Sequence, residues 1–197
     1  MDSVPFSFCD AVVSSFKCPT VFDPCQLDST EFHNWKAALQ EHNAKRTPLS
    51  LFVHCVDGVW SYKFTMNVVS LKFNDVLKMQ RKYLIIDSVF IGLEHHGFGA
   101  SFEEIRQVFK LAFSLVYGSK LHINNIDAND VQMAHLLSSA QIASFYRIVL
   151  LKYKDAYEQF IRDQINRGNM KIFHLFDRCP AALALEAEFK GDKVKKI

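Results

Sequence analysis

Histidine and cysteine are the residue types in this chain that could carry chemistry, because imidazole and thiolate groups bind metals and move protons. The densest group is Glu94-His95-His96-Gly97. Adjacent histidines on a loop face one metal only if the backbone bends, and no Asp, Glu or Cys is spaced to complete a site. We interpret the group as a polar loop between a strand and a helix. The sequence therefore predicts no metal site and no cofactor.

Two cysteines have neighbours that could alter their reactivity. His54 and Cys55 are adjacent on an expected strand, so their side chains should point to opposite faces and not meet. Cys179 precedes Pro180 at an expected helix start, where a thiol can be activated, but a packed, inert thiol is the simpler interpretation. The chain has no phosphate-binding glycine loop, nucleophile elbow or H-E-x-x-H motif. We therefore predict that the protein is not an enzyme.

Composition narrows the class of protein further. The chain has 197 residues, 49% of them hydrophobic, and a net charge of +2, which is too small to predict nucleic-acid binding. Its five cysteines are odd in number and form no C-x-x-C pair, which favours reduced thiols over a disulfide framework. No apolar run reaches the ~18 residues of a membrane span, and the acidic start does not resemble a signal peptide. We expect a cytoplasmic or nuclear location and no membrane partner.

The elements that must position any site fall into two groups, and the first is helical. Helices are expected over 4–17 and from Asp28, which forms a capping box with Glu31. Each carries an apolar stripe: Phe8, Val12 and Phe16 in the first, and Phe32, Trp35 and Leu39 in the second. A polar run over 41–48 then marks a boundary. We therefore predict a helical module over 1–47.

The second group alternates strands and helices. Asp57-Gly58 lies between two alternating runs and predicts a β-hairpin with a type I′ turn. Beyond it we expect strands over 82–91, 121–124, 145–151 and 170–176. The helices expected between and after them run from Ser101, which forms a capping box with Glu104, to Gly118; from Asp127 or Asn129 as the cap to about Ser138; over 154–167, with Gly168 at the C-terminus; and from Pro180 onward. The last three strand centres are roughly 25 residues apart, within the range of leucine-rich-like repeats. We predict an α+β or α/β fold with irregular β-α repeats over 48–190 and a polar basic tail over 191–197.

The N-terminal module resembles an F-box. Val4-Pro5 corresponds to the Leu-Pro-like pair that opens the F-box plan, and Trp35-Lys36 to its closing Trp-Arg-like step. The whole chain resembles the large nematode (Caenorhabditis-type) F-box family. The similar stretches are Met1 to Val12, Phe52 to Phe64, Leu77 to Tyr83 and Phe160 to Leu175. The segment from Lys17 to Leu27, with two prolines and two cysteines, departs from the leucine-rich middle helix of that plan.

The resemblance implies a substrate receptor of a cullin–RING (Skp-cullin-F-box) ubiquitin ligase, in which the F-box docks on a Skp-type adaptor and the α/β region holds a protein substrate. The residues carried over to the adaptor face are Val4, Pro5, Phe8, Val12, Phe16 and Trp35. An alternative is a non-enzymatic binding module whose degenerate F-box has joined its own core and no longer binds the adaptor. Exposure of Val4, Phe8 and Trp35 would favour the first hypothesis, and their burial against the hairpin the second. An enzyme, the third hypothesis, would need a polar pocket with convergent titratable groups.

Overall fold

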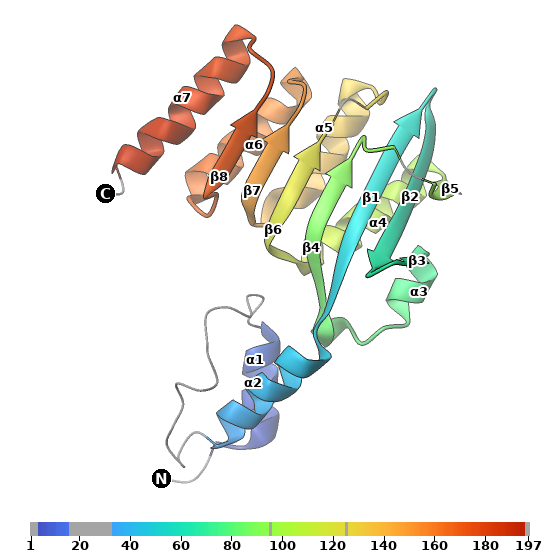
Figure 1. Ribbon diagram of the computed structural model, residues 1–197, viewed down its shortest axis with the longest axis vertical. Helices are drawn as coiled ribbons and strands as arrows, with labels where there is room; N and C mark the ends of the chain where they lie inside the picture. The colour runs from blue at the N-terminus through green and yellow to red at the C-terminus, as the bar shows by residue number, and fades with distance from the viewer. Residues whose placement is uncertain (1–3, 16–32, 95, 125, 196–197) are drawn as a thin grey trace.

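Two N-terminal helices form a small lobe beside a larger sheet domain in the computed structural model, which describes residues 4–15, 33–94, 96–124 and 126–195 (Figure 1). The helices are α1 (Phe6–Ser15) and α2 (His33–Lys45). Their buried contact is a separate cluster made of Cys9, Val13, Ala38 and Leu39, with Trp35 packed against it. The expected capping box at Asp28 and the end of the first stripe at Phe16 lie outside the described residues.

The larger domain is built on an eight-stranded sheet with the order β3-β2-β1-β4-β6-β7-β8, and β5 also pairs with β2. The strands are β1 (Thr47–Val56), β2 (Val59–Met66), β3 (Val69–Leu71), β4 (Leu84–Ile91), β5 (Phe98–Ala100), β6 (Val116–Ile123), β7 (Phe145–Leu150) and β8 (Ile172–Leu175). Neighbours from β1 through β8 along this path are parallel, whereas β2 pairs antiparallel with β1, β3 and β5. Helices combined with a mixed sheet confirm the predicted α+β or α/β class.

The β1–β2 hairpin turns where the sequence predicts it. Asp57 and Gly58 have φ values of 49° and 74°, the left-handed region that a type I′ turn requires at both positions. The Asp127 carboxylate accepts the Asp57 backbone N–H at 3.0 Å and so fixes the turn to a distant loop. Asp127 is therefore not the cap of the following helix. Asn129 is, because its side-chain oxygen accepts the backbone N–H of Gln132 at 2.8 Å.

Helices cover one face of the sheet. α4 (Phe102–Leu115), α5 (Asp130–Ser138) and α6 (Glu158–Arg167) lie behind the parallel strands in Figure 1. The main core lies between these two layers and includes the fully buried rings of Phe109, Phe113 and Phe145. α3 (Phe73–Leu77) and 3₁₀ turns at Arg81–Tyr83, Ser139–Ile142 and Asp155–Tyr157 complete the connections. In the described part of the chain, no helix covers the opposite face of the sheet.

The last helix packs beside the end of the sheet. α7 (Pro180–Lys195) begins at Pro180 as expected, and its Phe189 ring lies 5.8 Å from that of Phe173 on β8. The residues expected to form a polar tail from 191 are helical as far as Lys195. The preceding stretch of Ala, Leu, Glu and Lys is rich in strong helix formers, and Glu186 and Lys190 form an i,i+4 ion pair. These local preferences extend the helix beyond residue 191, where the sequence predicts a polar tail.

The expectation for Gly118 is wrong. The helix ends at Leu115, and Gly118 lies inside β6 with a φ of 61°. β6 therefore begins at Val116 and is longer than the expected strand over 121–124. The physical reason is the pairing of Val116 with Ile86 on β4. This tertiary contact places Val116 in the sheet instead of in the helix. The short elements β3, α3 and β5 also had no clear signal in the sequence.

Candidate functional site

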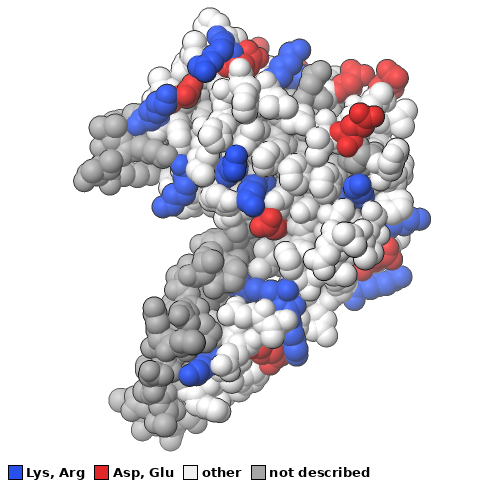
Figure 2. Space-filling model, in the orientation of Figure 1, with Lys and Arg blue, Asp and Glu red and all other residues white. Residues whose placement is uncertain are grey.

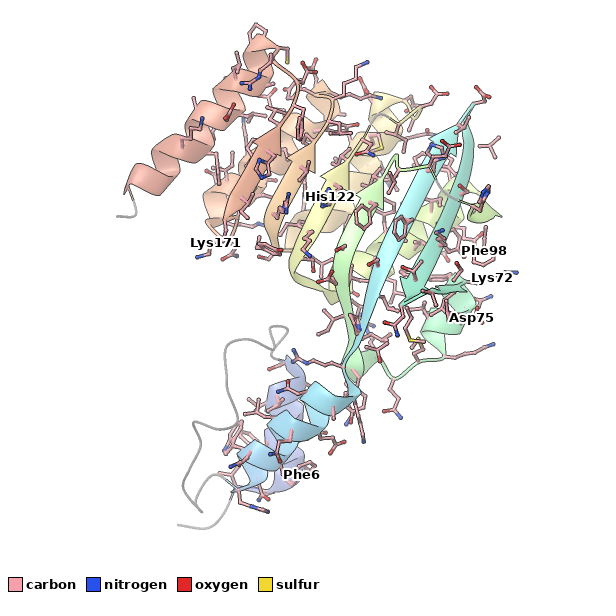
Figure 3. All side chains as sticks on the ribbon, viewed as in Figure 1. Phe6, Lys72, Asp75, Phe98, His122 and Lys171 are labelled. Carbon is pink, nitrogen blue, oxygen red and sulfur yellow. The ribbon has the colours of Figure 1, made fainter. Side chains whose placement is uncertain are left out.

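The helical lobe exposes three large apolar side chains close to its start. The exposed fractions are 40% for Val4, 37% for Phe6 and 54% for Phe8, and we call these three residues the apolar patch. Phe6 is labelled on this lobe in Figure 3. The Phe8 ring meets the half-buried Trp35 edge-on, with centroids 6.1 Å apart and an interplanar angle of 88°. The Asn34 side chain donates to the Val4 carbonyl at 2.7 Å and holds the chain's opening against α2.

The residues expected on the adaptor face are thus partly brought together. Val4, Pro5 and Phe8 are exposed, Val12 and Trp35 are half-buried, and Phe16 lies outside the described residues. The stripe that packs inward on α1 is Cys9 and Val13, one position beyond the predicted stripe. Small residues on α2, such as Ala38, allow the two helices to approach closely there. The large side chains of Phe6 and Phe8 consequently remain at the surface.

A polar network joins the helical lobe to the sheet domain. The imidazole of His42 is fully buried, its Nε2 lies 2.9 Å from the Asp10 carboxylate, and Lys82 donates to the same carboxylate at 3.1 Å. Next to it, the Tyr83 hydroxyl donates to the Glu41 carboxylate at 2.7 Å, which lowers the pKa of Glu41. Sequence patterns gave no signal for this network because its members come from three separate segments.

The open face of the sheet carries a row of aligned side chains, which we call the aromatic row. Strand register places its members side by side across six strands: Lys63, Phe52, Phe90, His122, Val149 and His174. The Phe52 and Phe90 rings are stacked with centroids 4.7 Å apart, and the Phe90 and His122 rings at 4.9 Å. Lys63 Nζ lies 5.4 Å from the centroid of the Phe52 ring. Figure 3 shows His122 on the face opposite the helices.

Two cations flank this row on the same face. Lys120 and Arg147 are register partners on β6 and β7 and lie two positions before His122 and Val149. Burial lowers the pKa of His122, and the charges of Arg147 and Lys120 lower it further. The ring is therefore neutral at neutral pH.

Other residues considered for chemistry are not assembled into a reactive site. His54 and Cys55 point to opposite faces as predicted, because Cys55 lies in the core while His54 is half-buried on the open face. Burial raises the pKa of the Cys55 thiol, so it stays protonated. Cys179 packs against the core, and His95 lies outside the described residues.

Within the described ranges, no three His, Cys, Asp or Glu side chains are grouped so that they could hold a metal ion. Among the same residues, no helix is both long and apolar enough to span a bilayer.

No family model, curated protein or solved structure matches the chain. The apolar patch and the open sheet face are the two candidate interaction surfaces of the chain.

Proposed function

We propose that the chain is a non-enzymatic substrate receptor of a Skp-cullin-F-box ubiquitin ligase, acting in the cytoplasm or nucleus. Its helical lobe docks on a Skp-type adaptor, and its α/β domain holds a protein substrate. The observation that carries the proposal is the exposed apolar patch of Val4, Phe6 and Phe8 on a pair of helices that already has its own small core.

Energetics support a partner for this patch. Complete burial of a Phe or Val side chain is worth about 1.5–3 kcal/mol, so the patch as it stands leaves much of this free energy unused. Exposed large apolar side chains are a common feature of protein-binding surfaces. Aromatic residues such as Phe8 and the adjoining Trp35 are typical anchors of such interfaces.

The exposure of Val4 and Phe8 also distinguishes the adaptor-binding proposal from its alternative, in which the F-box-like helices belong to the protein's own core. If the helices had become part of the protein's own core, Val4 and Phe8 would pack against the β1–β2 hairpin. Instead, both are exposed, and α1 contacts the sheet domain through a polar pair, Asp10 and Lys82. The exposed patch therefore favours the adaptor-binding hypothesis.

Calorimetric titration with a purified Skp-type adaptor tests the proposal. The natural chain should bind, and Phe8→Asp should weaken binding about tenfold or more, because a carboxylate must then be desolvated in an apolar groove. Leu77→Asp on α3 is the matched control, since Leu77 has the same exposed fraction of 54%, and it should bind like the natural chain. Absence of binding by the natural chain, or equal binding by both variants, would contradict the proposal.

A further inference from the structure

The aromatic row is stacked in a way that determines which of its surfaces a ligand can reach. Phe52 and Phe90 lie almost parallel, with an interplanar angle of 14°, and Phe90 and His122 follow at 27°. Each ring face is thus covered by the next ring. Lys63 lies over the outer side of Phe52, and Val149 is the register neighbour of His122 on the other side. The rings consequently present their edges, not their faces, to solvent.

Ring edges and cations both make this surface electropositive. The edge of an aromatic ring is the positive part of its quadrupole and suits a carboxylate or carbonyl oxygen. Lys120 and Arg147 add full positive charges next to the row. Their acidic neighbour Asp87 lies 3.9 Å from Lys120, a long and exposed pairing that is energetically weak. Figure 2 looks onto this face and shows Lys and Arg side chains over the middle of the sheet.

Arg147 contributes an unsatisfied hydrogen-bond donor as well as a positive charge. Its Nε is buried, and no hydrogen-bond acceptor for it lies among the residues that the structure describes. A buried donor without a partner is costly, and such groups are rare in folded proteins. Because this Nε is shielded from solvent, an acceptor from a bound molecule would reach it only after the Arg147 side chain rotated outward.

We propose that the open face binds an extended acidic segment of a protein, with its carboxylates on Lys120 and Arg147 and its backbone along the ring edges of Phe52, Phe90 and His122. That this protein is a ubiquitination substrate rests on the function proposed above, whereas the acidic character of the ligand does not. The row crosses six strands spaced about 4.8 Å apart, which is roughly 24 Å. An extended peptide covers that distance with about seven residues.

The stacking also favours a peptide over a nucleic acid. Single-stranded nucleic acids bind to aromatic side chains mainly by laying bases on ring faces. Here the faces of Phe52 and Phe90 are taken by neighbouring side chains, so that neither ring offers a free platform. Cations on their own would attract either polymer, and the test must therefore include both.

Fluorescence anisotropy with the full chain tests the inference. The probe is a fluorescein-labelled oligoglutamate of about seven residues, and the comparison probes are an oligoglutamine of equal length and a single-stranded oligothymidylate. The natural chain should bind oligoglutamate more tightly than either. Lys120→Glu should weaken binding about five- to tenfold, and Lys110→Glu, a matched charge reversal on the exposed surface of α4, should leave it unchanged. Arg147→Gln and Phe90→Leu should each weaken binding and provide milder substitutions if Lys120→Glu does not fold.

The outcomes distinguish this inference from the proposed function. Oligoglutamate binding that depends on Lys120, in a chain that does not bind the adaptor, would support the acidic-ligand surface and contradict the ligase role. Equal affinity for oligoglutamate and oligoglutamine, or no effect of Lys120→Glu and Arg147→Gln, would overturn the inference. Tighter binding of oligothymidylate that is weakened by Phe90→Leu would also overturn it, because the face would then be a nucleic-acid surface.

Discussion

The buried imidazole of His42 on α2 lies 2.9 Å from the carboxylate of Asp10 on α1, and Lys82 at the edge of the sheet domain donates to the same carboxylate. Asp10 therefore joins both helices to the larger domain. This contact sets the orientation of the apolar patch relative to the open sheet face. If the chain acts as the substrate receptor proposed above, that orientation would decide where a bound substrate is presented.

His42→Ala should lower the free energy of unfolding by about 1–3 kcal/mol, because it removes a buried side chain that partners Asp10. Urea denaturation followed by circular dichroism measures this loss. His33→Ala, at the exposed start of the same helix, is the control and should change stability by less than about 0.5 kcal/mol. Equal effects of the two substitutions would show that the junction does not stabilise the lobe.

Acid should weaken the same junction. Burial by itself would raise the pKa of Asp10, but hydrogen bonds from Lys82 and His42, together with their charges, outweigh burial and hold the pKa below its usual value of 3.8. The folded state then binds fewer protons than the unfolded chain, so this contribution is complete above 3.8 and is lost as the pH falls through the lower folded value. Asp10→Asn should be less stable than the natural chain at neutral pH and lose less stability on acidification. Parallel stability–pH curves for the two proteins would refute this assignment.

Ser101→Ala should destabilise α4 by about 1 kcal/mol. The Ser101 hydroxyl accepts the backbone N–H of Glu104 at 3.2 Å, and this N–H has no intrahelical acceptor. Thermal or urea unfolding of the variant measures the loss. Ser138→Ala, near the end of α5, removes only an exposed hydroxyl bond to the His135 carbonyl and should have a smaller effect. The reverse order of the two effects would argue against the cap.

His122 should titrate below its usual pKa of 6.5, because burial and the charges of Arg147 and Lys120 disfavour its protonated form. Lys120→Gln should raise this pKa, and bound oligoglutamate should raise it as well, because carboxylates favour imidazolium. Nuclear magnetic resonance titration of the His122 ring follows both changes. Lys110→Gln is the control and should not move the titration midpoint. A midpoint insensitive to both Lys120→Gln and the peptide would mean that His122 does not sense charge on the open face.

Local signals were sufficient to predict much of the fold. The Asp57-Gly58 turn, the Ser101 cap and the left-handed Gly168 at the end of α6 each depend on neighbouring residues, and each agrees with its pattern. Gly118 has the same residue type as Gly168, but the pairing of β6 with β4 overrides the helix-end signal there. Local patterns are reliable only where no tertiary contact competes with them.

The sequence predicts residues of the apolar patch but not the aromatic row, and the reason is related. Val4 and Phe8 were found through the resemblance of the chain's opening, although helical periodicity misplaced the inward stripe by one position. Phe52, Phe90 and His122 lie on three strands that are distant in the sequence, and their stacking depends on strand order and register. Neither can be obtained from the alternation within a single strand. The aromatic row can therefore be recognised in the folded sheet but not in the sequence.

Hydrogen–deuterium exchange of the full chain, with and without a Skp-type adaptor, detects both adaptor binding and its location. The adaptor should slow exchange in α1 and α2 and leave the strands of the open face unchanged. Unaltered exchange in both helices at saturating adaptor, or protection confined to the sheet, would contradict it.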